Sequence, residues 1–202
     1  MCSRMHKNAV RPRQASDLFV GNTGPQTTMR DQFLLKVGVL NPTDAIRNSL
    51  RASLQRNKTY NEKAPAKLRA EFRLTWAELI AQAAEPYEHP IGDDLQHCKT
   101  IKGIADSLTK QHSSILDNET LRFGTSQKAF NLYLKFLWRL GCIPRPPHCP
   151  VDRVILGVAG ILGSWTACDS DQEYMSWIKK LREKAAGVNL GEWEYEQWMK
   201  NS

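Results

Sequence analysis

The segment FGTSQKAFNLYLKFLWRLGCIPRPPHCPVDRVIL, residues 123–156, carries the strongest helical pattern of the chain. Its first part predicts a helix over 126–140 that is almost entirely apolar and therefore buried around most of its circumference. Four polar residues nevertheless recur along one edge of this helix, at intervals of three, four and four: Lys128, Asn131, Lys135 and Arg139. Such a row must face either solvent or a wet cleft, and both interpretations stay open at this point.

The loop after this helix brings an aspartate to the start of a second apolar helix. The loop is rigid because it contains four prolines: Pro144, Pro146, Pro147 and Pro150. Asp152 follows it, and Val154, Ile155 and Val158 continue as a buried helical face. An aspartate in this place is most often an N-cap, and a role in catalysis is the alternative.

Helical patterns continue on both sides of this stretch. Two starts carry clear capping signals: Asn41 followed by Pro42, and Ser170 followed by Glu173 in a capping box. No segment reads convincingly as a strand. The remaining helices are expected over 30–40, 41–57, 64–84, 93–112, 151–162, 170–187 and 191–200. We therefore predict an all-α, compact bundle of about eight helices, with an irregular N-terminal arm over 1–28 and a single domain over 29–202.

Composition limits the classes of function. The chain has 202 residues and 41% hydrophobic residues, enough for a proper core. Its net charge of +7 favours a nucleic-acid partner over a protein that merely happens to be basic. No run of 18 apolar residues and no secretory-type segment is present, so we expect a cytoplasmic protein without a membrane partner.

The cysteines do not indicate a disulfide framework or a metal centre. There are five, an odd number at irregular spacing. Two His-Cys pairs, His97-Cys98 and His148-Cys149, suggest zinc, but the repeated short ligand spacing of zinc sites is missing. We predict reduced thiols, no metal and no cofactor.

The order of Gly124, Lys128 and the CPVD segment ending in Asp152 resembles the helix-hairpin-helix DNA glycosylase superfamily. The lysine is similar to that of its bifunctional branch, typified by 8-oxoguanine DNA glycosylases, and the long proline-containing connection is more similar to the archaeal 8-oxoguanine branch. The resemblance covers about residues 115–160. It implies a helix-hairpin-helix-like element and an active-site cleft. This chain departs from the pattern in having one glycine and a later lysine, which leaves Lys135 as an alternative nucleophile.

The resemblance implies roles for both residues. Asp152 would stabilise the positive charge that develops on the sugar as the base leaves, and Lys128 would attack C1′ as a neutral amine. Because the target base must leave the stack, aromatic and apolar neighbours are expected to hold it. The candidates for this base pocket are His148, Trp138, Tyr133 and Trp165.

Phosphate binding is expected at the start of the 126–140 helix, where free amides would accept an anion. Contacts of this kind hold the DNA without reading its sequence. The candidates are the amides of Gly124, Thr125 and Ser126 and the side chains of Lys135, Arg145 and Arg153.

The resulting hypothesis is a monomeric DNA glycosylase that excises a base from double-stranded DNA, with AP-lyase chemistry if the lysine forms a Schiff base. The substrate is an 8-oxoguanine-like base, for repair, or a hypermodified cytosine of phage DNA such as glucosylated hydroxymethylcytosine, for antiviral defence. One alternative is a non-catalytic helix-hairpin-helix module, in which Asp152 only caps and Lys128 only contacts phosphate. A third class is a helical protein-binding module with Trp193 and Trp198 as anchors.

Overall fold

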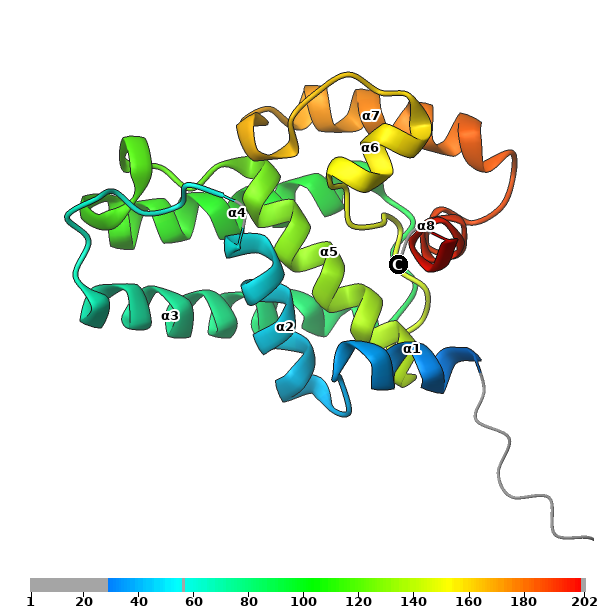
Figure 1. The fold of residues 1–202 in the computed structure, drawn as a ribbon, viewed down its shortest axis with the longest axis horizontal. Helices are drawn as coiled ribbons and strands as arrows, with labels where there is room; N and C mark the ends of the chain where they lie inside the picture. Colours follow the sequence, from blue (N-terminus) through cyan, green and yellow to red (C-terminus); the bar gives the residue numbers. More distant parts are fainter. Residues whose placement is uncertain (1–28, 56, 201–202) are drawn as a thin grey trace, which may run out of the picture.

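The computed structural model describes residues 29–55 and 57–200, and within them the fold is all-α (Figure 1). The helices are α1 Met29–Val37, α2 Pro42–Leu54, α3 Ala66–Ala84, α4 Asp94–His112, α5 Phe123–Leu140, α6 Arg153–Ala159, α7 Asp171–Ala185 and α8 Leu190–Lys200. Short 3-10 turns join some of them: η1 Glu85–Glu88, η2 Ser113–Ile115, η3 Asp117–Glu119 and η4 Trp165–Ala167. The predicted bundle of about eight helices is confirmed. The predicted arm over 1–28 lies outside the described residues.

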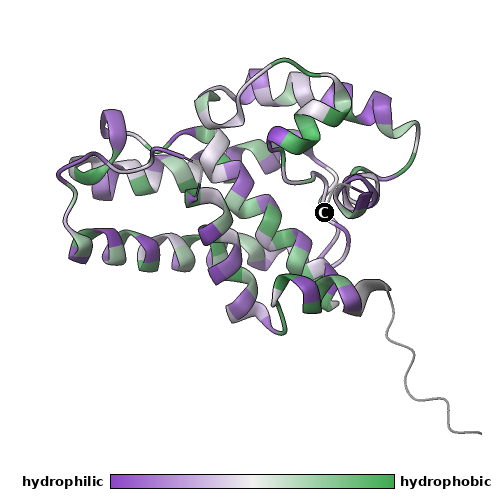
Figure 2. Cartoon of the chain, in the orientation of Figure 1, coloured by the Kyte–Doolittle hydropathy of each residue, from purple (hydrophilic) through white to green (hydrophobic). Residues whose placement is uncertain are grey.

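Helix α5 is the centre of the bundle. It contacts α1, α2, α3, α4 and η4, while α6, α7 and α8 contact one another beside it. Most of its residues are buried, as its apolar composition predicts. Figure 2 shows polar and apolar residues alternating around α3 and α7, the pattern of amphipathic helices with one face on the core. No described helix is long and apolar enough to cross a membrane.

Local capping fixes several helix starts. The Asn41 side chain accepts a hydrogen bond from the Asp44 amide at 2.9 Å, and Pro42 occupies the first turn of α2. The Ser170 hydroxyl accepts one from the Glu173 amide at 3.2 Å at the start of α7. Both predicted N-caps are confirmed.

The start of α5 differs from the prediction. It begins at Phe123 instead of near residue 126, so Gly124 lies within its first turn. A Cβ atom on Gly124 would lie 1.7 Å from the carbonyl oxygen of Trp165, so only glycine fits against η4 here. The segment between α4 and α5, residues 113–122, carries the turns η2 and η3. Gly124 therefore serves helix packing.

Candidate active site

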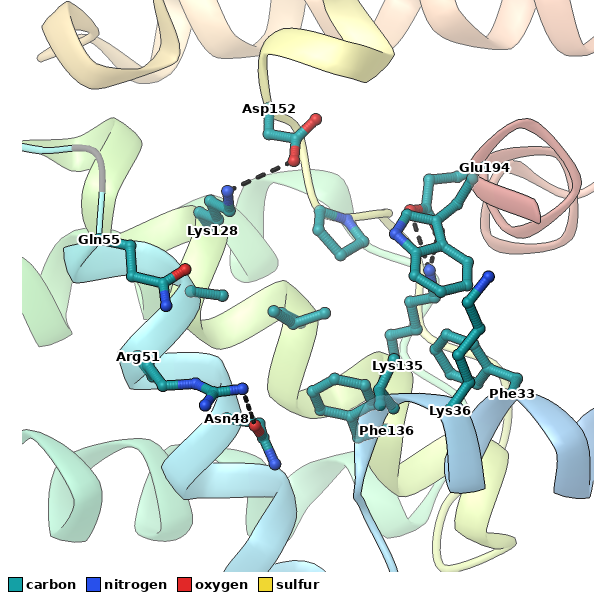
Figure 3. A pocket seen from close by; sticks show the side chains of 15 residues that line it. Phe33, Lys36, Asn48, Arg51, Gln55, Lys128, Lys135, Phe136, Asp152 and Glu194 are labelled. Atoms are coloured by element: carbon teal, nitrogen blue, oxygen red, sulfur yellow. Dashed lines mark hydrogen bonds and ion pairs between the residues drawn. The ribbon is translucent and has the colours of Figure 1, made fainter. Parts of the chain in front are cut away.

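Lys128 and Asp152 meet where α5 passes the start of α6 (Figure 3). The lysine Nζ lies 3.3 Å from Oδ2 of the aspartate. The other carboxylate oxygen, Oδ1, accepts hydrogen bonds from the amides of Val154 at 2.9 Å and Ile155 at 3.2 Å. Asp152 is therefore the predicted N-cap of α6, and it also forms an ion pair. Capping fixes the carboxylate while leaving one oxygen for the lysine.

An aromatic ring covers the lysine. The Nζ of Lys128 lies 4.4 Å from the ring centroid of Trp165, a cation–π distance. Only 12% of the Lys128 side chain is exposed, against 29% of the Asp152 side chain. The ammonium is held between an indole and a carboxylate, and what remains accessible faces two clefts.

The ion pair forms part of the wall of both clefts. The first cleft has a volume of about 370 Å³ and lies among α1, α2, α5 and α8. Its lining includes Phe33, Lys36, Asn48, Arg51, Gln55, Lys128, Leu132, Lys135, Phe136, Pro150, Asp152, Glu194 and Trp198. The second cleft has a volume of about 420 Å³ and is lined by Lys128, Asp152, Arg153, Val154, Gly163, Ser164, Trp165 and Thr166. A molecule in either cleft can therefore reach the pair.

Polar groups of α2 enter the first cleft (Figure 3). The Arg51 guanidinium donates to Oδ1 of Asn48 at 3.0 Å. The side-chain nitrogen of Asn48, Nδ2, donates to the backbone carbonyl oxygens of Asp44 at 3.1 Å and Gly38 at 3.3 Å, so the Asn48 side chain is itself held in place. Asn48 thus orients Arg51, which is exposed and has four more N–H groups to offer. Sequence reasoning did not single out either residue.

The second lysine of the row, Lys135, is engaged elsewhere. Its Nζ lies 2.9 Å from Oε1 and 2.7 Å from Oε2 of Glu194 in α8. Each of these side chains is 4% exposed, and the rings of Phe33, Trp198 and Tyr195 lie 5.1, 5.6 and 5.9 Å from the ammonium. Burial raises the pKa of the Glu194 carboxyl, and the charge of Lys135 opposes this rise. The pair ties α5 to α8, so the predicted phosphate contact at Lys135 is wrong.

The amides predicted to bind phosphate are not free. Gly124 N donates to the carbonyl of Cys168 at 2.8 Å, and Thr125 N and Ser126 N each donate to the carbonyl of Arg122 at 3.1 Å. All three residues are buried, and the Ser126 hydroxyl donates to the carbonyl of Ile101 at 2.9 Å. The predicted phosphate site at this helix start is therefore wrong, because packing of α5 against η4 and α4 occupies it.

The two predicted arginine contacts lie on the surface. Arg145 forms an ion pair with Glu192. Arg153 is exposed and lines the second cleft beside Asp152. The structure thus brings Arg153 to the candidate site and leaves Arg145 outside both clefts.

Of the four residues predicted for a base pocket, one lies at the ion pair. Trp165 covers Lys128. His148 is completely buried, and Tyr133 is buried in the core. Trp138 packs under Arg139, whose Cζ lies 4.5 Å from the centroid of the indole ring. None of these three lines either cleft, so their predicted role is wrong: His148 and Tyr133 lie in the interior of the bundle, and Trp138 is half-buried against its core.

The four polar residues along one edge of α5, Lys128, Asn131, Lys135 and Arg139, face neither plain solvent nor a single cleft. Asn131, the second member of the row, belongs to a buried hydrogen-bonded network. Its Oδ1 lies 2.8 Å from Nε2 of His97, whose Nδ1 lies 2.6 Å from the hydroxyl of Tyr87. Its Nδ2 donates to the hydroxyl oxygen of Tyr174 at 2.9 Å. Because an amide oxygen only accepts, His97 carries its proton on Nε2 and Tyr87 donates to Nδ1.

The network continues to the proline-rich loop. Tyr174 contacts Nδ1 of His148 at 2.9 Å, and Nε2 of His148 contacts Oδ1 of Asp94 at 2.9 Å. Arg182 closes the chain with two hydrogen bonds to Asp94, at 2.6 and 2.8 Å. These bonds from Arg182 and His148 hold the pKa of the Asp94 carboxyl well below its usual range. The loop that ends in Asp152 is thus anchored to α4 and α7.

Burial keeps both histidines neutral. It lowers the pKa of His97 to about 3, with help from neighbouring His148, and it lowers the pKa of His148 as well. Both rings are completely buried. Each hydrogen bond of the network finds a donor and an acceptor when both imidazoles are neutral, whereas protonation at Nδ1 would force the hydroxyl of Tyr87 or Tyr174 to accept where it now donates.

This arrangement predicts acid sensitivity. Between the unfolded pKa of about 6.5 and a folded pKa of about 3, the unfolded state binds more protons, so stability falls as the pH falls. His97 alone should lower the free energy of unfolding by about 2 kcal/mol between pH 7.5 and pH 5. Urea unfolding followed by tryptophan fluorescence at both pH values measures this loss. Between the two pH values, the free energy of unfolding of His97→Gln should fall by about 2 kcal/mol less than that of wild type. An equal fall in both proteins would contradict the assignment of His97 as a buried neutral histidine.

Among the described residues, no group of three or more His, Cys, Asp or Glu could hold a metal ion. Cys98, Cys142, Cys149 and Cys168 are free thiols. Burial raises the pKa of Cys98 to about 11 and that of Cys168 to about 12, so both are poor nucleophiles at neutral pH. Cys98 and Cys168 therefore do not compete with Lys128 as candidate nucleophiles.

Comparisons with protein-family models, with curated proteins and with solved structures found no match for this chain.

Proposed function

We propose that this chain is a DNA glycosylase that excises a damaged or modified base through Lys128 and Asp152. The observation that carries the proposal is their ion pair: an amine and a carboxylate 3.3 Å apart, shared by two clefts, with the second carboxylate oxygen fixed by two amides. The net charge of +7 supports a polyanionic partner.

The pair suits cleavage of an N-glycosidic bond. As the bond from C1′ to the base breaks, its electron pair leaves with the base and positive charge develops on the sugar. The Asp152 carboxylate stabilises that charge, and the base leaves after taking up a proton. The Lys128 ammonium gives its proton to the departing base, and the neutral amine then attacks C1′ and forms a C–N bond. When the sugar ring opens, a proton moves from that nitrogen to the ring oxygen, which leaves a Schiff base between Lys128 and C1′. If water attacks instead, the product is an abasic site.

The first cleft is the proposed base pocket. A nucleotide on duplex DNA must swing out of the stack to reach the pair. A volume of about 370 Å³ equals about 12 water volumes, enough for a base the size of a purine. Apolar side chains of Phe136 and Leu132 line it, and Arg51 and Gln55 supply hydrogen-bonding groups. Arginine pairs well with an edge that carries two acceptors, as guanine-like bases do.

The second cleft is the proposed path of the DNA backbone. Arg153 supplies a cation there, and the hydroxyls of Ser164 and Thr166 lie 2.9 Å apart at its edge. Groups of these kinds contact phosphates without reading sequence. In this proposal the sugar lies beside the ion pair, with the base in the first cleft and the phosphates in the second.

Arg51 provides a test of the base pocket. The variant Arg51→Ala should lower kcat/KM for the cognate base about 10- to 100-fold, because a bidentate arginine contact contributes about 1–3 kcal/mol of discrimination. Affinity for DNA without that base should change much less. Single-turnover excision and fluorescence anisotropy measure the two quantities.

The matched control is Arg47→Ala, one turn earlier on α2. Arg47 pairs with Asp44 and does not line the first cleft. Equal losses in the two variants would show that Arg51 contributes only general attraction for DNA.

A non-catalytic DNA-binding module is the competing function, since Asp152 does cap α6. Abasic-site formation separates the two. Ordinary duplexes and duplexes containing 8-oxoguanine, uracil, an alkylated base, or hydroxymethylated or glucosylated cytosine are incubated with the protein, and abasic sites are then counted. Abasic sites on one type of DNA would support the glycosylase and identify its substrate, which distinguishes repair from antiviral defence. DNA binding without sites on any of them supports the module.

A further inference from the structure

Gln127, the residue before Lys128, is bonded to Val151, the residue before Asp152. Its Nε2 donates to the carbonyl oxygen of Val151 at 2.6 Å, and its Oε1 accepts from the amide of Val151 at 3.2 Å. Both residues are completely buried. The side chain of Gln127 therefore pairs with both polar groups of Val151, as a neighbouring strand would.

The glutamine is fixed from its other side as well. Asn131, one turn later on α5, donates from Nδ2 to Oε1 of Gln127 at 3.2 Å. Asn131 is held in turn by His97 and Tyr174. A primary amide suits this position because it offers a donor and an acceptor together, whereas a carboxylate offers acceptors alone.

We propose that Gln127 is a positioning residue that sets the register between Lys128 and Asp152. It links the two chain segments one residue before each member of the ion pair, so the Nζ–Oδ2 separation depends on it. The consequence for catalysis rests on the proposed glycosylase function. Without the amide, both polar groups of Val151 would be left unpaired in the interior, and the segment would shift to find partners. A shift of about 1 Å can cost about 100-fold in rate.

The test compares Gln127→Leu with Ser126→Ala. Leucine removes both hydrogen bonds with Val151 and the one from Asn131, and it keeps a similar volume. Ser126 is the neighbouring buried residue on α5, and its hydroxyl bonds to Ile101 in α4, away from the 151–152 segment. Both variants lose buried polar contacts, so a merely structural effect would appear in both.

The first readout does not depend on any activity. The amides of Val154 and Ile155 are held by Oδ1 of Asp152, so their hydrogen exchange reports where that carboxylate lies. Measured by NMR against the amide of Trp76 in the core of α3, their exchange should speed up about 10-fold in Gln127→Leu. In Ser126→Ala it should change less than about 2-fold. Unchanged exchange in Gln127→Leu would overturn the proposal.

The second readout is excision. In Gln127→Leu, kcat should fall about 100-fold while the Kd for DNA stays within about 2-fold, and Ser126→Ala should keep its kcat. Full kcat in Gln127→Leu would overturn the catalytic consequence. If wild type excises no base from any DNA, the glycosylase proposal fails, and the exchange data still decide whether Gln127 positions Asp152.

Discussion

Asp152→Asn is expected to lose base excision by about 100-fold or more while binding DNA as wild type does. In the proposed mechanism the rate falls because the negative charge beside C1′ is missing, and one preorganised electrostatic group at a transition state contributes about 10²- to 10³-fold. The fold should persist because asparagine is as good an N-cap as aspartate, and its Oδ1 can accept from the amides of Val154 and Ile155. Single-turnover excision and DNA affinity are the two measurements.

The matched control for this variant is Asp93→Asn. Asp93 is also an N-cap, with Oδ1 accepting from the Leu95 amide at 2.8 Å at the start of α4, and it lines neither cleft. It should retain full activity. Turnover by Asp152→Asn equal to that of Asp93→Asn would reject the catalytic role of Asp152 and leave it as a cap.

Lys128→Gln is expected to abolish any covalent adduct with DNA, the second large effect. If the amine attacks C1′, borohydride reduces the Schiff base and joins the protein to the DNA permanently. Glutamine cannot form that bond, so the trapped band on a denaturing gel should disappear. Loss of the ammonium should also slow excision, because Asp152 loses its partner at 3.3 Å.

The alternative nucleophile, Lys135, is tested in the same assay. Because a lone buried Glu194 would destabilise the protein, Lys135 and Glu194 are both replaced by glutamine. This double variant should still form the adduct. An adduct that survives in Lys128→Gln and disappears in the double variant would transfer the role to Lys135.

The helix starts that could be predicted from the sequence are those with local causes. Asn41 and Ser170 bond to amides three residues ahead, so a short window of sequence contains the whole interaction. The α5 start depends on Gly124 packing against Trp165, 41 residues away in sequence, and nothing near Gly124 signals that contact. The expected free amides were wrong for this reason.

The candidate site was predictable in part. Lys128 and Asp152 were singled out by a polar residue on an apolar helix and by an aspartate after a rigid loop, and the structure brings them together. Arg51 was not singled out, because it lies on an amphipathic basic helix where Arg47 follows the same pattern. What distinguishes Arg51 is the cleft, and the cleft forms between helices that are far apart in the chain.

Lys135 could not be told apart from Lys128 by sequence alone. In sequence it shares one edge of α5 with Lys128, at helical spacing, and both are lysines among apolar residues. Their partners, Glu194 and Asp152, lie 59 and 24 residues further along the chain. The Lys135–Glu194 pair is enclosed by aromatic rings and borders the first cleft with side chains that are only 4% exposed, whereas the Lys128–Asp152 pair is more exposed and lines both clefts. Only the packing of α6 and α8 separates a structural lysine from a candidate nucleophile.

Base excision through Asp152 is tested most directly by mass-spectrometric detection of the free base released from the panel of modified DNAs. Wild type, Asp152→Asn and Asp93→Asn are assayed together. We expect one base to be released from one type of DNA, in equal yield by wild type and Asp93→Asn, with none above background from Asp152→Asn. Release of no base by wild type, or equal release by all three proteins, would contradict it.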